Sequence, residues 1–352
     1  MSSSPTGTFI NAISSAAAAS TTATASPSCI TTTPDKNGHV PIIDCRAIWI
    51  YNPSIAAAVV LSVLFGLTTA IHIIQARIYR KSFCWVIIMA GIWETTGFIL
   101  RIISAKNQLL LKIYIPEELL ILLSPIWINA FDYMLLGRMV YFFLPEQKVL
   151  GINAIRFARY FVAADIASFF IQAIGGSILS QGTNESTKQL NLGLHIYMAG
   201  IGIQEGFILF FATLAIMFHR RMIQLEREGI LELKGQLSWR PLLYTLYASL
   251  TLITVRIIFR LVQYASGFLS TIPTHEAYFY ALEALPMFLA LLIMNITHPG
   301  RTLIGPDSEF PRKTRQQKKE EKRIKKEQKR IEKEQKRMER EQKRQTDWNN
   351  AV

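Results

Sequence analysis

The sequence contains little cysteine and no common catalytic or nucleotide-binding motif. Its 352 residues include three cysteines, none in a CxxC pair, which argues against zinc ribbons and thioredoxin-like chemistry. The ATP-binding pattern G-x-x-x-x-G-K-[ST] is absent, as are the hydrolase patterns H-E-x-x-H and G-x-S-x-G. We therefore expect no P-loop ATP site and no cofactor.

Charge is also scarce along most of the chain. Half of the residues are hydrophobic and 18% are charged, which is typical of a bilayer-embedded protein with polar ends. The net charge of +13 comes mostly from residues 311–344, which hold 17 Lys and Arg against 7 Glu. A basic segment that follows apolar spans favours contact with anionic lipid or a protein. No nucleic-acid partner is expected, because nothing else resembles a groove reader.

The composition of the first residues predicts that they are not a cleavable signal peptide. Residues 1–34 are rich in Ser, Thr and Ala and lack both a charged leader and a long apolar run. We expect a disordered extracellular segment over residues 1–50, because such a composition has little to bury. Cys29 and Cys45 fall in it, either joined by a disulfide or left as free thiols.

Seven apolar windows are long enough to cross about 30 Å of hydrocarbon, which takes about 20 helical residues. Backbone polar groups must be satisfied within the bilayer, so the sequence predicts an all-α bundle of seven transmembrane helices over residues 51–300. A basic helical tail follows over residues 301–352. The predicted spans are 53–75, 84–104, 119–143, 157–179, 194–218, 241–266 and 276–297.

The distribution of Lys and Arg among the loops predicts the orientation of the bundle. The first, third and fifth loops hold 11 of these residues, against 5 on the opposite side. Because cytosolic loops carry the excess, the N-terminus is predicted outside and the C-terminus in the cytosol. Asn184-Glu185-Ser186 is an N-glycosylation acceptor in the fourth loop, which this topology places outside.

The tail repeats every seven residues, with one apolar residue per repeat at Ile324, Ile331 and Met338. A coiled coil needs two apolar positions per heptad. We therefore expect a solvated charged helix with i,i+4 pairs such as Glu332–Lys336 and Glu339–Lys343. A self-associating helix is the alternative.

Many polar residues lie within the predicted spans and share helix faces, as do Glu94 and Arg101, which are seven residues apart. Such residues usually face the bundle interior or a water-filled cavity. The candidate cavity residues are Glu94, Arg101, Asp132, Asp165, Gln172, Gln204, Glu205, Arg256, Arg260, Glu276, Tyr280 and Glu283.

Two interpretations of this polar interior stay open. Six acids meet four arginines if Arg138 is included, so the interior is acidic on balance and suits the ammonium head of a cationic amphiphile. Alternatively, these groups pair with one another and join the helices, each hydrogen bond contributing about 1 kcal/mol or less.

Three histidines mark the predicted cytosolic ends of their spans: His72, His219 and His298. Three histidines at one depth could hold zinc, as in intramembrane lipid hydrolases. The alternative is that each marks a helix end at the membrane interface. We expect no metal site.

An ordered set of motifs runs through residues 45–300. It includes Tyr51-Asn-Pro-Ser-Ile, His72, Glu94-Thr-Thr-Gly97-Phe with Arg101, Ser124-Pro125, Tyr133, Gly137-Arg138, Asp165-Ile-Ala-Ser168 through Gln172 to Gly175-Gly176, Gly202-Ile-Gln204, Arg256-Ile-Ile-Phe-Arg260, Glu276, Tyr280, Glu283 and His298-Pro299-Gly300. This set resembles the fungal lipid-translocating exporters, also called the RTA-like or resistance-to-aminocholesterol family.

The resemblance implies a seven-span fungal membrane protein, of the plasma membrane or an inner membrane, that moves or resists sphingoid bases and other amphiphiles. It supplies no catalytic residues. Gln263 stands where the family usually has Glu, Glu283 stands where it usually has Asp, and Asp132 is unusual beside Tyr133.

Three functional hypotheses follow. The first is an exporter or flippase of sphingoid bases or similar cationic amphiphiles, and it predicts that the interior carboxylates are needed for transport. The second is a seven-helix lipid sensor that signals through its cytosolic loops and tail. The third is a zinc-dependent lipid hydrolase. We favour the first, a plasma-membrane protein that is not an enzyme and whose partners are the bilayer and an amphiphilic lipid.

Overall fold

The computed structural model describes residues 30–35, 38–41, 44, 46–49, 51–180, 187–229, 238–265, 271–305 and 308–310, together with 320, 323–324, 326–328, 330–335 and 337–339. The chain divides into two compact units, Met1–Ser308 and Glu309–Val352. The first unit contains the helical bundle and the second contains the tail, and each is described separately.

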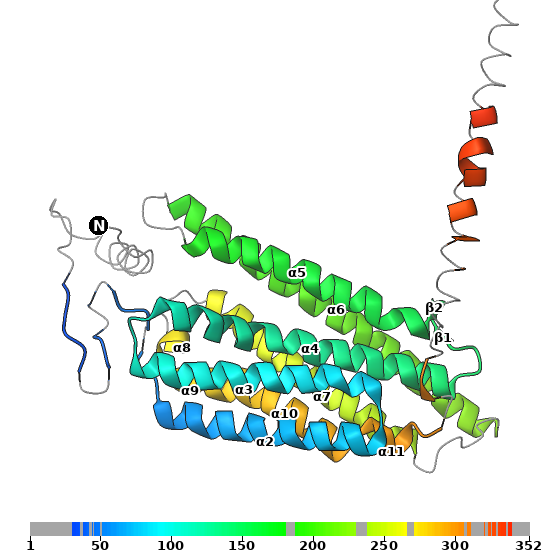
Figure 1. The fold of residues 1–352 in the computed structure, drawn as a ribbon, viewed down its shortest axis with the longest axis horizontal. Helices are drawn as coiled ribbons and strands as arrows, with labels where there is room; N and C mark the ends of the chain where they lie inside the picture. The colour runs from blue at the N-terminus through cyan, green and yellow to red at the C-terminus, as the bar shows by residue number, and fades with distance from the viewer. Residues whose placement is uncertain are drawn as a thin grey trace, which may run out of the picture. The chain divides into compact units, whose positions relative to one another are not determined.

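Seven spans long and apolar enough to cross a membrane run alongside one another in the first unit (Figure 1). The first six are α2 (Ile55–Tyr79), α3 (Trp85–Lys106), α4 (Leu111–Phe143), α5 (Phe157–Ser180), α6 (Thr187–Arg227) and α7 (Trp239–Ala265). The seventh is built from α9 (Glu276–Phe279), the π-helical turn η3 (Tyr280–Ala284), α10 (Leu285–Ile296) and α11 (Pro299–Thr302). The prediction of an all-α bundle with seven membrane spans is confirmed.

Short elements connect the spans. They are the 3-10 turns η1 (Ser82–Cys84) and η2 (Ala154–Arg156), the helical turn α8 (Thr271–Thr274), and the strands β1 (Lys148–Val149) and β2 (Ile152–Asn153). The two strands form an antiparallel hairpin in which Lys148 lies opposite Asn153. This hairpin leads from α4 into α5.

The helices extend beyond the predicted apolar windows where charged residues interrupt the sequence pattern. Helix α4 begins at Leu111 rather than at 119, and it therefore includes Glu117 and Glu118. Helix α6 runs from Thr187 to Arg227, longer at both ends than the predicted 194–218. Hydropathy detects only the part of a helix that faces hydrocarbon, so it underestimates helices with polar ends.

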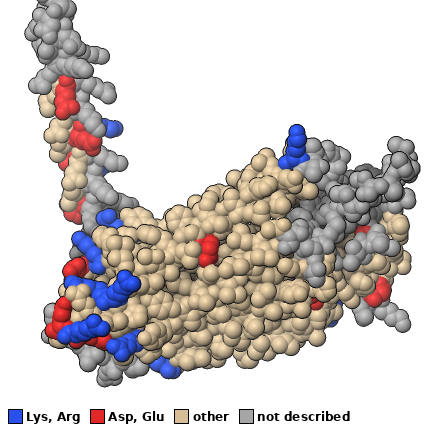
Figure 2. All heavy atoms as spheres, turned by 180° about the vertical axis from the view of Figure 1, so that it is seen from behind, with Lys and Arg blue, Asp and Glu red and all other residues tan. Residues whose placement is uncertain are grey.

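The surface of the bundle is apolar along every span. Figure 2 shows a broad belt of uncharged side chains on one face, with Lys and Arg side chains gathered at one end. Such a belt is unfavourable in water and fits the hydrocarbon of a bilayer. Exposed apolar residues, one from each span, are Val60, Ile99, Leu119, Phe170, Leu209, Ile258 and Leu285.

Part of the N-terminal segment packs on the bundle. Val40, Ala47 and Trp49 are buried, and the Val40 amide donates to Gln108 Oε1 at 3.1 Å. Val40 and Trp49 thus supply apolar contacts that the Ser/Thr/Ala-rich stretch lacks, and the disorder expected over residues 1–50 stays a prediction. Residues 1–29 and Cys45 lie outside the described residues, and the Cys29–Cys45 alternatives remain a prediction.

The Asp44 carboxylate joins two parts of this N-terminal segment through its hydrogen bonds. The Arg46 guanidinium lies 2.9 Å from Asp44 Oδ2, and the Thr32 amide donates to the same oxygen at 2.7 Å. The hydrogen bond from Arg46 holds the pKa of the Asp44 carboxyl below its usual range. Asp44 is thus kept ionised and bonded to both Arg46 and Thr32.

The described residues of the tail between 320 and 339 are helical and exposed. Arg323 pairs with Glu320 at 3.6 Å and Arg330 pairs with Glu327 at 3.8 Å. Exposed pairs of this kind contribute little stability. The predicted partners Lys336 and Lys343 lie outside the described residues, and self-association remains the alternative interpretation.

Candidate functional site

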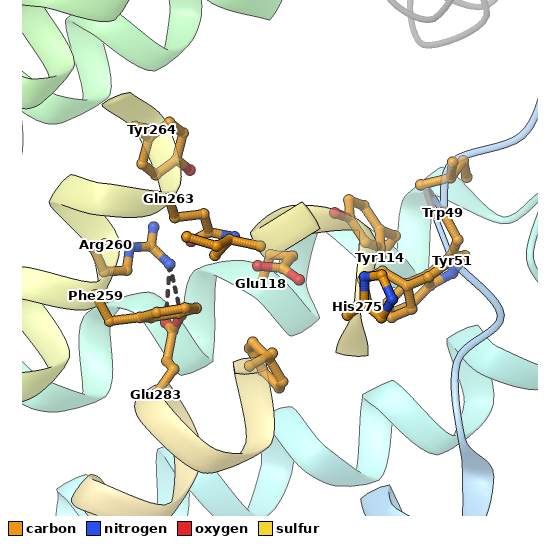
Figure 3. A pocket seen from close by; sticks show the side chains of 13 residues that line it. Trp49, Tyr51, Tyr114, Glu118, Phe259, Arg260, Gln263, Tyr264, His275 and Glu283 are labelled. Carbon is orange, nitrogen blue, oxygen red and sulfur yellow. Dashed lines mark hydrogen bonds and ion pairs between the residues drawn. The ribbon is translucent and has the colours of Figure 1, made fainter. Parts of the chain in front are cut away.

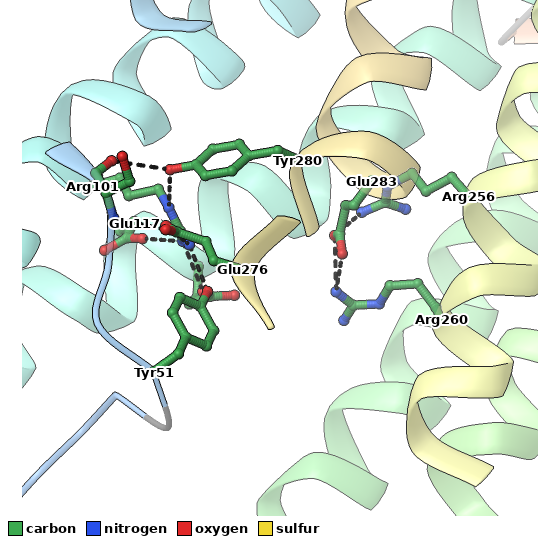
Figure 4. A network of polar contacts seen from close by, with 10 residues as sticks. Tyr51, Arg101, Glu117, Arg256, Arg260, Glu276, Tyr280 and Glu283 are labelled. Atoms are coloured by element: carbon green, nitrogen blue, oxygen red, sulfur yellow. Dashed lines mark hydrogen bonds and ion pairs between the residues drawn. The ribbon is translucent and has the colours of Figure 1, made fainter. Parts of the chain in front are cut away.

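One buried arginine contacts several carboxylates at the end of the bundle near the N-terminal segment. Arg101 on α3 is fully buried, and its Nη1 atom lies 2.9 Å from Glu117 Oε1 and 3.6 Å from Glu118 Oε1. Its Nη2 atom lies 3.5 Å from Glu276 Oε1. Together with Tyr51 and Tyr280, these residues form what we call the Arg101 cluster (Figure 4).

Aromatic and phenolic groups complete the surroundings of Arg101. The guanidinium carbon lies 4.7 Å from the ring centre of Trp49 and 4.1 Å from that of Phe279, which favours a cation over each ring face. Arg101 Nη2 also donates to Tyr51 OH at 2.7 Å. Burial raises the pKa of the Tyr51 phenol, so Tyr51 stays neutral and accepts this hydrogen bond.

A second cluster lies on the other side of the last span. Glu283 Oε1 lies 2.9 Å from Arg256 Nη2 and 2.9 Å from Arg260 Nη1. Arg260 Nη2 donates to Tyr197 OH on α6 at 2.6 Å. We call these four residues the Glu283 cluster, which joins α6, α7 and the π-helical turn η3.

The pairing differs from the face assignments that sequence spacing suggested. Arg101 pairs with Glu117 on α4, while Glu94, also buried, has its Oε2 atom without a hydrogen-bond partner among the described residues. Figure 4 shows Glu276 and Tyr280 pointing toward Arg101 and Glu283 pointing toward Arg256 and Arg260. The π-helical turn carries one extra residue per turn, so these three residues do not share a face.

A cavity of about 170 Å³ lies between the two clusters. We call it the aromatic cavity, and Figure 3 shows its lining. The Glu118 side chain faces it and is 36% exposed, while Arg260 and Glu283 form part of the wall. The lining residues are Ile48, Trp49, Tyr51, Tyr114, Glu118, Phe259, Arg260, Gln263, Tyr264, Ile272, His275, Phe279 and Glu283.

The charges around the aromatic cavity do not balance. The two clusters hold the carboxylates Glu117, Glu118, Glu276 and Glu283 and the guanidiniums Arg101, Arg256 and Arg260. In their charged forms, the carboxylates therefore outnumber the guanidiniums by one. Glu117, Glu276 and Glu283 each lie within 3.5 Å of an arginine, whereas Glu118 makes the longer contact and faces the cavity. One cation beside Glu118 would balance this excess.

The other predicted polar residues form local bonds between helices. Ser249 Oγ donates to Asp132 at 2.7 Å, and Tyr133 OH donates to Asp165 at 2.9 Å. Thr254 Oγ1 donates to Glu205 at 3.0 Å. For these acids the structure favours the interhelical interpretation over a shared cavity.

Two glutamines lie apart from the aromatic cavity. Gln172 on α5 donates to Gln204 on α6 at 2.9 Å. Both line a smaller crevice of about 20 Å³, together with Pro125, Arg256 and Arg260. They are therefore connected to the Glu283 cluster and not to the Arg101 cluster.

The three histidines have separate partners. His72 Nε2 lies 3.1 Å from the Leu291 carbonyl oxygen, and His219 Nδ1 lies 3.4 Å from Tyr247 OH. His298 Nδ1 accepts from the Gly300 amide at 3.1 Å. Within the described part of the chain, no three His, Cys, Asp or Glu side chains are placed to hold one metal ion.

Several residues of the site were missed from the sequence. Glu117 and Glu118 fell outside the predicted third span, and Trp49, Tyr114 and Tyr197 were not singled out. A signal existed for Glu117, which lies seven residues before the buried Ser124 and so shares its helix face. Asn184, the predicted glycosylation site, lies outside the described residues.

Comparisons with known proteins place this architecture in a family. The family described as "RTA1 like protein" matches residues 87–305. The "Probable lipid transporter atnI" of Emericella nidulans is 48% identical over 310 residues, covering 86% of this chain and 81% of the relative. The "Sphingoid long-chain base transporter RSB1" of Saccharomyces cerevisiae is 24% identical over 289 residues, covering 74% of this chain and 75% of the relative.

A third relative bears a different name. The "Protoporphyrin uptake protein 1" of Saccharomyces cerevisiae is 28% identical over 281 residues, covering 70% of this chain and 90% of the relative. No solved structure matches the chain. With a family match over most of the bundle and a relative nearly half identical along most of its length, the chain belongs to the RTA1-like family of multi-pass membrane proteins.

Proposed function

We propose that this protein is a transporter of the plasma membrane that exports sphingoid long-chain bases or similar cationic amphiphiles and confers resistance to them. Two relatives are named as lipid transporters, one of them for sphingoid long-chain bases. The observation that carries the proposal is the aromatic cavity, in which Glu118 faces open space and the neighbouring arginines are already paired.

The chemistry of the cavity suits an ammonium group. The Glu118 carboxylate and the rings of Trp49, Tyr114 and Phe259 line the open volume, and carboxylates and aromatic rings both attract a cation. An ammonium beside Glu118 would balance the excess carboxylate. Binding of an anionic head at the same place would add a second uncompensated negative charge, which is costly away from water.

The apolar belt of the bundle allows the alkyl chain of an amphiphile to stay in the surrounding bilayer. An alkyl chain is as stable in the bilayer as it would be in an apolar pocket, so the protein needs to hold only the polar head. The volume of about 170 Å³ is in keeping with a small head and is too small for a whole lipid. A transported lipid would therefore keep its tail in hydrocarbon.

Release of labelled phytosphingosine from fungal cells tests the proposal. We compare the intact protein, an empty vector and Glu118→Gln at equal expression. The control is Glu146→Gln, since Glu146 is exposed and pairs with Arg221 away from the cavity. Loss of a charge-assisted bond of about 1.5–3 kcal/mol predicts release roughly tenfold or more slower in Glu118→Gln. Glu146→Gln should match the intact protein.

Equal release from all four strains would contradict export. Saturable binding of the base to the purified protein without faster release would instead favour the lipid sensor hypothesis. Conversion of the base to a product by the purified protein would favour an enzyme.

A further inference from the structure

Helices α5 and α6 form a tightly joined pair. A Cβ atom added at Gly175 would lie 2.5 Å from the Tyr197 amide nitrogen, and one added at Gly200 would lie 2.9 Å from the Gln172 amide nitrogen. Backbones approach this closely only where glycine leaves room. The two helices are therefore expected to move as one unit.

This helix pair is held firmly against α4 at one end of the bundle. Tyr133 of α4 lies 5.1 Å from Phe161 and 4.6 Å from Phe211 between ring centres, and all three are buried. Phe157 stacks on Phe161 in the same group. Aromatic packing of this kind adds about 0.5–1.5 kcal/mol per pair beyond the burial of area.

Toward the other end, α5 and α6 diverge from α4 (Figure 1). Here Leu122, Pro125 and Ile126 of α4 face Phe169 and Gln172 of α5 across the crevice of about 20 Å³, which we call the α4–α5 crevice. That volume holds about one water molecule. Pro125 cannot donate a backbone hydrogen bond, so α4 is weakened at this level.

The floor of the α4–α5 crevice is polar although its rim faces the apolar belt. Gln172 of α5 and Gln204 of α6 line it and bond to each other, and Arg256 Nε is buried there without a hydrogen-bond partner among the described residues. Polar groups at such depth usually mark a substrate path. Arg260 lines both this crevice and the aromatic cavity, so the two spaces share a wall.

We propose that the α4–α5 crevice is the lateral entrance through which a lipid head leaves the bilayer and reaches the aromatic cavity. This inference rests on the proposed function. The α5–α6 pair separates from α4 and the head, which carries a hydrogen-bond acceptor such as a hydroxyl, passes Gln172, Gln204 and Arg256. The head then reaches Arg260 and Glu118 while the alkyl chain stays in the bilayer.

A reversible staple across the crevice tests the entrance. Leu122→Cys and Phe169→Cys are introduced together into a background whose three native cysteines are changed to alanine, and the pair is joined by a short bifunctional thiol reagent cleaved by reductant. The control pair is Glu146→Cys with Arg221→Cys, which joins α6 to the segment that follows α4, where both side chains are exposed and form an ion pair away from the crevice. Release of labelled phytosphingosine is measured before stapling, after it and after reduction.

We expect stapling of the crevice to slow release at least tenfold, reduction to restore it, and the control staple to leave it unchanged. Full release from the stapled crevice would overturn the lateral entrance and leave the proposed export intact. If neither the native protein nor the unstapled variant released the base, both the export function and the lateral entrance would be overturned.

Discussion

At the scale of single residues, Arg101 determines how this end of the bundle is assembled. A lone guanidinium in hydrocarbon is costly, and here carboxylates from α4 and the last span, a tyrosine and two aromatic rings surround it. Sequence spacing identified Arg101 as an interior group. It could not identify Glu117 as its partner, because partners on different helices are chosen by tertiary packing.

Replacement of Arg101 tests this assignment. Arg101→Gln leaves Glu117 buried without its cation, and breaking a buried pair from one side costs about 3–5 kcal/mol of stability. We expect a corresponding loss in unfolding experiments on the detergent-solubilised protein. The double variant Arg101→Gln/Glu117→Gln should recover a large part of the loss, since no unpaired charge remains at that contact. A single variant as stable as the parent would show that Arg101 does not hold these elements together.

At the scale of helices, α5 and α6 depend on the absence of side chains at their contact. Gly193 and Gly200 lie seven residues apart on the buried face of α6, with Tyr197 between them. The same helix also carries Gly202, where an added Cβ would meet nothing within 4 Å. Helix α6 thus provides a tight glycine and an unconstrained one two residues apart.

This pair of glycines allows a matched experiment. In Gly200→Ala the new methyl group would lie 2.7 Å from Gln172 Cγ and 2.9 Å from the Gln172 amide nitrogen, and the backbone cannot move aside locally. Overpacking predicts a loss of about 1–3 kcal/mol. Gly202→Ala should be neutral or up to about 1 kcal/mol more stable, because alanine favours helix. Thermal unfolding of the two variants measures this difference in stability. Equal stabilities would contradict close α5–α6 packing.

The sequence predicted helices well and their ends poorly. Windows of apolar residues located all seven spans, because the bilayer imposes a length and a composition on each. Glu117 and Glu118 were lost because they interrupt hydropathy just where α4 begins. The turn η3 was not predictable either, since an extra residue in a helical turn leaves no mark in composition.

At the scale of the whole molecule, the uneven distribution of basic residues is visible on the surface. Figure 2 shows Lys and Arg gathered at one end of the apolar belt. Exposed members of this group include Arg77, Arg80, Lys148 and Arg156. The positive-inside tendency predicts that this end faces the cytosol.

Glycosylation of Asn184 tests the orientation. We expect glycosidase treatment of the protein from fungal membranes to shift its electrophoretic mobility, and Asn184→Gln to abolish the shift. Asn295-Ile296-Thr297 matches the same acceptor pattern and provides a control, because its predicted place at the inner end of the last span keeps it from the glycosylation machinery. A shift that disappears in Asn295→Gln rather than in Asn184→Gln would invert the topology.

The π-helical turn η3 also has a mechanical consequence. It lies between the part of the last span that holds Glu276 and the part that continues into α10, while carrying Glu283 itself. If a π turn migrates by one residue, the residue that it passes turns by about 100° about the helix axis, while the helix on either side keeps its orientation. Glu283 lies within this turn, so the position of the turn along the span determines whether Glu283 faces Arg256 and Arg260, while Glu276 lies before the turn and contacts Arg101.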